Sequence, residues 1–132
     1  LMVIDTSAII AILSNEPDAS QLAGTIAAVD LRFMSAASLL ESAIVIESRY
    51  GPSGGQKLDE LIATAEIQIE PVTVDQVSIA RTAFRTYGKG RHPAGLNFGD
   101  CFAYALAKAK EVPLLFKGDD FSRTDIRAVP PG

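Results

Sequence analysis

Short apolar runs alternate along the chain with longer segments in which apolar residues recur every three or four positions. Short apolar runs bounded by polar or turn residues are typical of buried strands, and the longer spacing is typical of amphipathic helices. The pattern predicts five short strands, at Met2–Ile4, Leu31–Met34, Ile67–Ile69, Leu114–Phe116 and Ile126–Val129.

Six helical segments lie between these runs. They are predicted at Ala8–Leu13, from Glu16 through Val29, from near Ser38 to about Tyr50, at Leu58–Ala65, at Val74–Tyr87 and from Phe98 to about Lys110. Thr6, Ser7 and Asn97 are N-cap types, and Ser38 with Glu41 has the spacing of a capping box. Stretches 51–55 and 88–96 are predicted to be loops. Strands that alternate with helices predict an α/β fold of three layers, with a mostly parallel sheet between two layers of helices.

The composition fits one globular domain over residues 1–132, because 48% of the residues are hydrophobic and a chain of this length can bury an adequate core. No apolar run approaches the roughly 18 residues of a membrane span. The beginning of the chain lacks the basic region and the cleavage site of a secretory signal. The single cysteine, Cys101, cannot form an intrachain disulfide, which fits a reducing cytosol. We therefore expect a cytoplasmic protein without membrane contact.

The net charge of −4 conceals an asymmetry. Residues 1–80 carry a net charge of −8, and residues 81–132 carry +4. A locally basic segment on an acidic protein favours an anionic partner, although a solvated helix face with a loop has the same pattern.

Five acidic residues occupy equivalent places in the predicted fold. Asp5 follows the first strand, and Asp119 and Asp120 follow a later one. Glu41 and Asp100 each lie in the first turn of a predicted helix. In a parallel α/β sheet these places lie along one edge, where ligands bind. The five acids are therefore expected to converge although they are far apart in the sequence.

Each acid also has an ordinary structural explanation. Asp5 can cap a helix, Glu41 can complete a capping box, and Asp100 can complement a helix dipole. The remaining two acids can form a turn. Glu41, however, is the only charge in Met34–Ile46. It is therefore expected to be partly buried and to need a partner or a cation.

Clustered carboxylates repel one another, so some would take up protons unless a cation were bound. Hard divalent ions such as Mg²⁺ or Mn²⁺ prefer oxygen ligands. One histidine and one cysteine are too few for a typical structural zinc site. The sequence thus favours a Mg²⁺ or Mn²⁺ site suited to phosphoryl chemistry.

Four features that span nearly the whole chain carry a family resemblance. They are MVIDTSA at Met2–Ala8, the mid-chain Glu41, LNFGDCFAYALA at Leu96–Ala107 and LLFKGDDFSRTDI at Leu114–Ile126. Together they resemble the PIN-domain ribonucleases, and in particular the VapC toxins of bacterial toxin–antitoxin pairs. The resemblance implies a metal-dependent endoribonuclease built as a single PIN domain.

The resemblance also implies roles for the acids. Asp5 and Asp100 would bind the metal, and Glu41 with a fourth acid would hold its waters. Many PIN domains carry the fourth acid two residues after the strand, where this chain has Gly118. Either Asp119 or Asp120 therefore takes the role, or the site works with three acids.

Supporting residues and partners follow from the same resemblance. Thr6 and Ser7 are expected to support the site by hydrogen bonds. Phosphate contacts need only placed charge, and the basic residues expected to contact RNA are Lys89, Arg91 and Lys117.

The resemblance implies a homodimer neutralised by a small VapB-like antitoxin. The helical stretches Leu22–Val29 and Leu39–Ile46 are candidate partner surfaces, with core burial as the ordinary alternative. The functional alternative is a PIN fold that binds RNA or a protein without cutting.

Other residues with reactive or aromatic side chains are expected to be structural. His92 is expected to be a solvated or RNA-facing residue of the basic loop, and Cys101 an inert packing residue. Tyr87, Tyr104 and Phe98 could stack on bases, but packing in the core is the expectation for all three.

Overall fold

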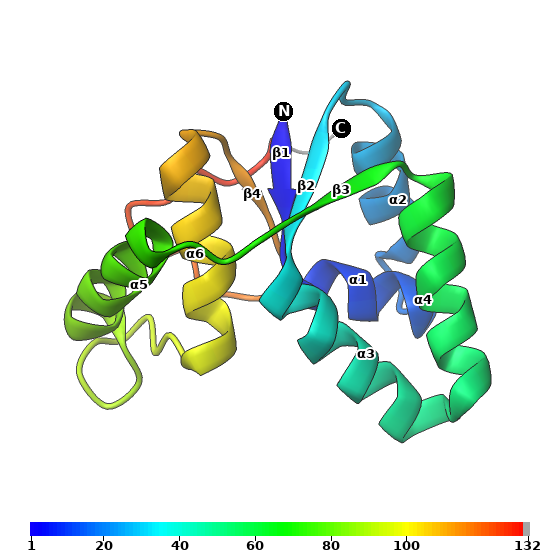
Figure 1. The fold of residues 1–132 in the computed structure, drawn as a ribbon, viewed down its shortest axis with the longest axis horizontal. Helices are drawn as coiled ribbons and strands as arrows, with labels where there is room; N and C mark the ends of the chain where they lie inside the picture. Colours follow the sequence, from blue (N-terminus) through cyan, green and yellow to red (C-terminus); the bar gives the residue numbers. More distant parts are fainter. Residues whose placement is uncertain (131–132) are drawn as a thin grey trace.

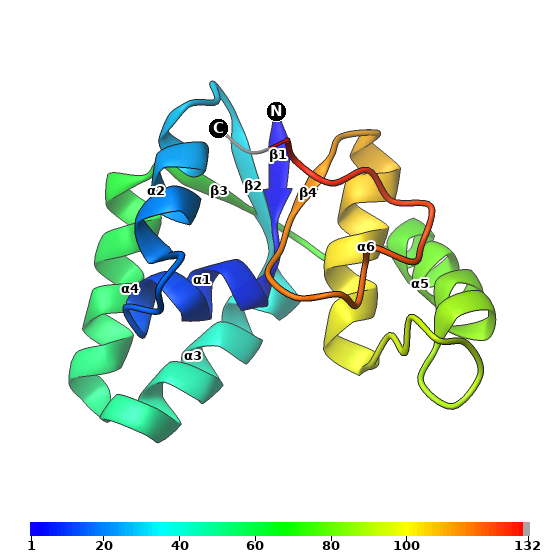
Figure 2. The same ribbon diagram turned by 180° about the vertical axis from the view of Figure 1, so that it is seen from behind.

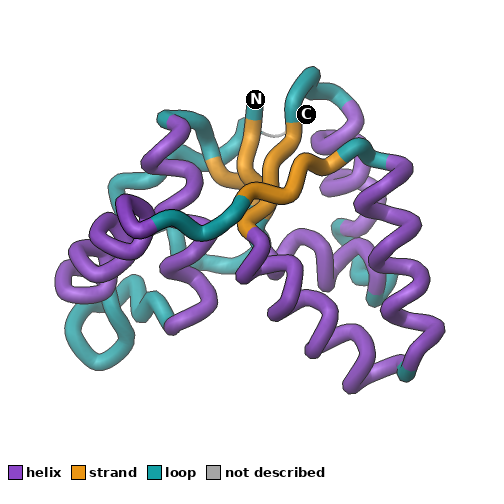
Figure 3. Tube along the Cα trace, in the orientation of Figure 1, coloured by secondary structure: helices purple, strands orange, loops and turns teal. Residues whose placement is uncertain are grey.

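The computed structural model describes residues 1–130 and contains one sheet of four parallel strands (Figures 1 and 3). The strands are β1 (Met2–Ile4), β2 (Arg32–Ser35), β3 (Ile67–Glu70) and β4 (Leu114–Leu115), in the spatial order β3-β2-β1-β4. In the register of the central strand, Val3 pairs with Phe33 on one side and with Leu114 on the other. Four of the five predicted strands and the parallel α/β architecture are confirmed.

The predicted strand at 126–129 is wrong. Only a single bridge forms there, between Ala128 and Leu114. The N–H of Leu114 donates to the carbonyl of Arg127 at 2.8 Å, and the N–H of Val129 donates back at 3.0 Å. Pro130 follows directly and has no N–H to extend the ladder.

Six helices cover the two faces of the sheet. They are α1 (Thr6–Leu13), α2 (Ala19–Ala27), α3 (Ala36–Tyr50), α4 (Pro52–Thr64), α5 (Val74–Tyr87) and α6 (Phe98–Lys110). Figures 1 and 2 show α5 and α6 on one side of the sheet and α1 to α4 on the other. Within residues 1–130, no helix has both the length and the apolar character needed to cross a membrane.

Both faces of the sheet are buried, which explains why its strands are continuous apolar runs. Val3 and Leu114 point into the core beneath α5 and α6. Met2 and Ile4 point into the core on the side of α1, α2 and α4.

Helix α4 begins earlier than the glycine-rich sequence predicts. Residues 51–55 were expected to form a loop, but the helix starts at Pro52, with Gly51 as its N-cap at φ 72°. Pro is favoured in the first turn because that position needs no N–H acceptor. A Cβ atom at Gly54 would lie 2.6 Å from Ile46 Cγ2. The glycine therefore allows α4 to pack closely on α3.

The first two helices also begin elsewhere than predicted. Asp5 caps α1 in place of Thr6 or Ser7, and its carboxylate accepts a hydrogen bond from the Ser7 N–H. Helix α2 begins at Ala19, so Pro17 lies before it.

The predicted capping box of Ser38 and Glu41 is wrong. Ser35 caps α3 and accepts a hydrogen bond from the Ala37 N–H at 3.2 Å. Ser38 is buried inside the helix, and its hydroxyl has no partner among the described residues. Glu41 consequently lies in the second turn of α3, where its carboxylate is free for other contacts.

The carboxyl ends of the strands meet three helix N-termini at one edge. Strand β1 leads into α1, β2 leads into α3, and α6 begins at the same end of the molecule (Figures 1 and 2). The segment after β4 crosses this edge near the start of α1, since the N–H of Lys117 donates to Ser7 Oγ at 2.9 Å. The fold therefore brings four distant segments of the chain together.

The opposite end of the sheet is stabilised by Arg32. Its guanidinium donates to the carbonyls of Ile26, Ala27 and Val29 at 2.6, 3.3 and 2.7 Å, and to that of Ala65 at 3.1 Å. These carbonyls belong to the C-terminal ends of α2 and α4 or follow them. A cation there also complements the negative ends of both helices.

Replacing Arg32 by methionine is expected to lower the free energy of unfolding by about 2 kcal/mol, because several carbonyls are left without a charged donor. Arg49→Met is the matched control, since Arg49 makes a single exposed hydrogen bond to Ser14 and should cost less than about 0.5 kcal/mol. Urea unfolding of both variants measures the difference. Equal destabilisation would contradict the role of Arg32.

Candidate active site

Asp5 lies at the centre of this edge and is 3% exposed. Its Oδ2 accepts hydrogen bonds from the Ser7 backbone N–H at 3.0 Å and from Ser7 Oγ at 2.6 Å. Ser7 in turn accepts from the N–H of Lys117. Ser7 therefore fixes the orientation of Asp5 and ties it to the segment after β4.

Glu41 reaches the same edge from α3. Its Oε1 accepts a hydrogen bond from Thr6 Oγ1 at 2.6 Å. Its carboxylate also lies directly against the backbone of Gly99, because a Cβ atom there would be 2.7 Å from Glu41 Cδ. Thr6 and Gly99 thus place Glu41 between the first turns of α1 and α6, half-buried as predicted.

Asp100 is the third residue of α6 and is 9% exposed. It forms a reciprocal capping box with Asn97: the Asp100 N–H donates to Asn97 Oδ1 at 2.9 Å, and the Asn97 N–H donates to Asp100 Oδ2 at 3.0 Å. The predicted cap and the ordinary structural explanation of Asp100 are both confirmed. The capping box still leaves its carboxylate close to other acids.

Asp120, rather than Asp119, lies next to Asp100. The charge of Asp120 acts on the Asp100 carboxyl and contributes to its raised pKa. The backbone carbonyl of Asp119 instead accepts hydrogen bonds from the N–H and hydroxyl of Ser122, at 3.2 and 2.8 Å. Asp119 therefore forms a turn, and Asp120 is the fourth acid of the cluster.

Burial and neighbouring negative charges both raise the pKa values of acids in the cluster. Burial raises the pKa of Asp5 from 3.8 to about 6, against the lowering effect of the Ser7 hydrogen bonds and with a further increase from the charge of Glu41. The pKa of Asp100 is raised to about 7, mainly by burial and in part by the charges of Asp5 and Asp120, against the lowering effect of the hydrogen bond with Asn97. Asp5, Glu41, Asp100 and Asp120 thus form one interacting set.

The donor set fits a hydrated divalent ion. All four side chains are carboxylates, which Mg²⁺ and Mn²⁺ prefer. Within residues 1–130, no three acidic, histidine or cysteine side chains converge closely enough to hold an ion by direct ligation alone. Mg²⁺ keeps several waters and is commonly bound through one or two carboxylates. The arrangement therefore suits two direct carboxylate ligands with the other acids contacting waters.

The basic residues expected to contact RNA lie outside the carboxylate cluster. The ammonium of Lys117 pairs with Glu16 and with Asp18, the latter at 3.2 Å, so its charge is already balanced. Lys89 and Arg91 are exposed in the loop between α5 and α6, with the Arg91 guanidinium 5.9 Å from the centre of the Phe84 ring.

The remaining candidates have structural roles. His92 Nδ1 accepts a hydrogen bond from the Ala94 N–H at 3.0 Å, and its ring meets Tyr87 edge-on. Cys101 is buried, and burial raises the pKa of its thiol, which confirms a packing role. Tyr104 is 5% exposed and belongs to the core, as expected, whereas Phe98 is 79% exposed and contradicts the expectation of core packing.

Residues 2–127 of this chain match the PIN domain family. The chain belongs to the PIN-domain family. This PIN domain is 58% identical to a Ribonuclease VapC of Mycolicibacterium smegmatis, over 97% of this chain and 99% of that protein. It is 56% identical to Ribonuclease VapC30 of Mycobacterium tuberculosis, over 97% of this chain and 98% of that protein. The resemblance identified from the sequence is confirmed.

Solved structures agree on the fold. The PIN domain superposes on VapC20 of Mycobacterium tuberculosis, described as a sarcin–ricin loop cleaving toxin, with a TM-score of 0.81 and 17% identity, covering 99% of this chain and all of the other. A toxin–antitoxin complex from Klebsiella pneumoniae gives a TM-score of 0.72 at 17% identity, covering 95% of this chain and 93% of that chain. At these identities the likeness shows the fold alone.

Three residues that shape the site were not found from the sequence. Gly99 is needed because Glu41 occupies the space of its missing side chain, and the signal available was a glycine directly before an acid in the first turn of a helix. Glu16 and Asp18 were assigned only to the start of a helix, yet they hold Lys117 and with it the segment that carries Asp120.

Gly99→Ala is expected to displace the Glu41 carboxylate, since the added methyl group and Glu41 cannot both occupy that space. The flexible side chain can move aside, so the free energy of unfolding should change by less than about 1 kcal/mol. Ribonuclease activity, measured on the same preparations, should fall at least tenfold, by about 1.4 kcal/mol or more of transition-state free energy.

Gly24→Ala is the matched control, because nothing lies within 4 Å of a Cβ atom there. It should keep full activity and gain up to about 1 kcal/mol of stability. Full activity of Gly99→Ala would contradict the placement of Glu41.

Proposed function

We propose that this chain is a metal-dependent endoribonuclease toxin, acting as a single PIN domain in the bacterial cytoplasm, where its RNA substrate is found. The observation that carries the proposal is the convergence of Asp5, Glu41, Asp100 and Asp120 at one edge of the sheet. Burial, with a smaller contribution from the neighbouring acids, raises the pKa of Asp5 to about 6 and that of Asp100 to about 7. Ribonuclease relatives at 56–58% identity over 97% of the chain support RNA as the substrate.

The acidic residues of the site have two proposed roles. Asp5 and Asp100 would hold Mg²⁺ or Mn²⁺, and Glu41 and Asp120 would hold its waters. The bound ion would activate water and neutralise charge on the scissile phosphate. Ser7 and Thr6 keep Asp5 and Glu41 in place through their 2.6 Å hydrogen bonds.

Partner binding is the second element of the proposal. We infer a homodimer that a VapB-like antitoxin neutralises, supported by the likeness of the fold to the Klebsiella pneumoniae complex. Leu40 and Ile44 expose 62% and 58% of their surface on one face of α3, which suits a protein contact. The stretch Leu22–Val29 supplies no such face, because Leu22 and Ile26 are buried in the core. A cationic antitoxin side chain among the acids would replace the charge of the metal.

Asp5→Asn and Asp100→Asn are expected to abolish RNA cleavage and the growth arrest on expression, because each removes a proposed metal ligand. EDTA should abolish cleavage by the wild type, and Mg²⁺ or Mn²⁺ should restore it. Variants that match the wild type in both assays would contradict the proposal that these carboxylates form the catalytic site. RNA that is bound but never cut with any metal would favour the binding module.

The pair Asp120→Asn and Asp119→Asn tests which acid completes the site. Asp120→Asn should lower kcat at least tenfold, about 1.4 kcal/mol, because Asp120 lies beside Asp100. Asp119→Asn should leave kcat within about twofold, since only the backbone of Asp119 makes the turn contacts. A larger loss at Asp119 would reverse the assignment.

Lys89→Gln with Arg91→Gln should weaken RNA binding, because the loop then neutralises fewer phosphates. The slope of log affinity against log salt should fall by about 0.7 for each phosphate that is no longer neutralised. Lys57→Gln, on α4 in the opposite helical layer, removes a positive charge far from the loop and serves as the control. An unchanged slope in the double variant would remove the loop from the RNA-binding surface.

A further inference from the structure

Phe98, the first residue of α6, is 79% exposed. A large aromatic side chain that remains exposed to water does not contribute the favourable free energy that burial in the core would give. The Phe98 ring nevertheless contacts Phe102, edge to face, with centroids 4.9 Å apart and planes at 86°. One face of the pair therefore remains available to a ligand.

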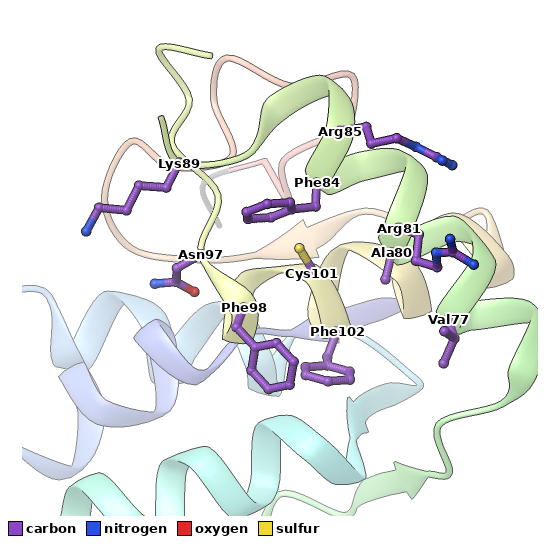
Figure 4. Close-up of a pocket in the computed structure, with 10 residues that line it drawn as sticks. All are labelled: Val77, Ala80, Arg81, Phe84, Arg85, Lys89, Asn97, Phe98, Cys101 and Phe102. Carbon is purple, nitrogen blue, oxygen red and sulfur yellow. The ribbon is translucent and has the colours of Figure 1, made fainter. Parts of the chain in front are cut away.

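The two rings belong to an apolar groove of about 840 Å³ between α5 and α6. Figure 4 shows Phe98 and Phe102 on α6, with Phe84 and Ala80 on α5 and the Cys101 thiol between the helices. A volume of this size accommodates a group as large as a nucleotide.

Three cations stand at the rim of this apolar groove. Arg81 and Arg85 extend from α5, and Lys89 extends from the beginning of the next loop (Figure 4). No carboxylate within residues 1–130 forms an ion pair with any of the three. An apolar floor with unpaired positive charge at its rim suits a ligand that is aromatic and anionic at once.

The groove adjoins the carboxylate cluster through the first turn of α6. Phe98 is followed by Gly99, which contacts Glu41, and then by Asp100. An RNA strand that passes over the beginning of α6 can therefore contact both the acids and the groove.

We propose that this groove is a subsite for an unpaired nucleotide of the RNA, with the base stacked on Phe98 and the adjoining phosphates on Arg81, Arg85 and Lys89. The proposal rests on the ribonuclease function proposed above. A nucleotide is favoured over a second copy of the chain because a homodimer contact has no evident use for three unpaired cations. The contact with a base also supplies a means of selecting unpaired RNA.

Binding is measured on an Asp100→Asn background, so that the RNA stays intact. The probes are a short single-stranded RNA of mixed sequence, the same strand with abasic positions, and the corresponding duplex. Phe98→Ala should weaken binding to the single strand by about 5- to 150-fold. It should have little effect on the abasic strand or the duplex, which offer no free base.

Two further variants control for structure. Val74→Ala removes a side chain on α5 that is 83% exposed and lies outside the groove, and it should leave binding unchanged. Phe98→Trp keeps a stacking surface and should retain the affinity. The chain contains no tryptophan, so the fluorescence of Phe98→Trp reports the groove alone and should be quenched by the single strand but not by the abasic strand.

The salt dependence of RNA binding distinguishes the contribution of the cations from that of the Phe98 ring. Arg81→Gln with Arg85→Gln should lower the salt slope by about 1.4, whereas Phe98→Ala should leave the slope unchanged while lowering the affinity.

Several outcomes would overturn the proposal. Unchanged affinity of Phe98→Ala for single-stranded RNA, in a protein whose wild type cleaves RNA, refutes the subsite and leaves the ribonuclease intact. Failure of the wild type to cleave RNA refutes the proposed function instead. If Phe98→Ala dissociates a dimer in sedimentation while its RNA affinity is unchanged, a second copy of the chain occupies the groove.

Discussion

The burial of neighbouring carboxylates at the carboxyl end of the sheet is the constraint on which this structure depends. Asp5, Glu41, Asp100 and Asp120 approach one another from four segments of the chain, and burial removes the water that would screen Asp5 and Asp100. The protein supplies neutral donors: Ser7 to Asp5, Thr6 to Glu41 and the Asn97 N–H to Asp100. These donors orient the acids but do not balance their charge, which is the role of the divalent cation in the proposed function.

The fold brings these acidic residues together. Parallel strands place the beginnings of α1, α3 and α6 at one edge, and Gly99 lets the first turn of α6 approach Glu41 without a side chain between them. The segment after β4 is held from both sides, by its backbone hydrogen bond to Ser7 and by the pairing of Lys117 with Glu16 and Asp18. Lys117, close to Asp119 and Asp120 in the sequence, thus holds this segment in place. Arg81, Arg85 and Lys89, which form no ion pair within residues 1–130, line the groove between α5 and α6.

Much of this arrangement is predictable from local pattern, and the rest depends on contacts between distant residues. Four strands follow from short apolar runs, and the convergence of the acids follows from parallel topology. The choice of Asp120 over Asp119 depends on the turn closed by Ser122, and the early start of α4 depends on contact between Gly54 and Ile46. The exposure of Phe98 likewise depends on how α5 and α6 pack. The local sequence pattern, an aromatic residue at the beginning of an apolar helix, predicts burial in the core.

The pH dependence of stability, compared in EDTA and in Mg²⁺, tests the central claim most directly. Raising a carboxyl pKa from 3.8 to about 6, as at Asp5, corresponds to about 3 kcal/mol. In EDTA the folded protein binds protons more tightly than the unfolded chain, so the free energy of unfolding should fall as pH rises from about 4 to about 7. Asp100→Asn should reduce that fall, and saturating Mg²⁺ should remove most of it by stabilising the ionised carboxylates. An identical pH profile in EDTA and Mg²⁺, unaltered in Asp100→Asn, would contradict the account.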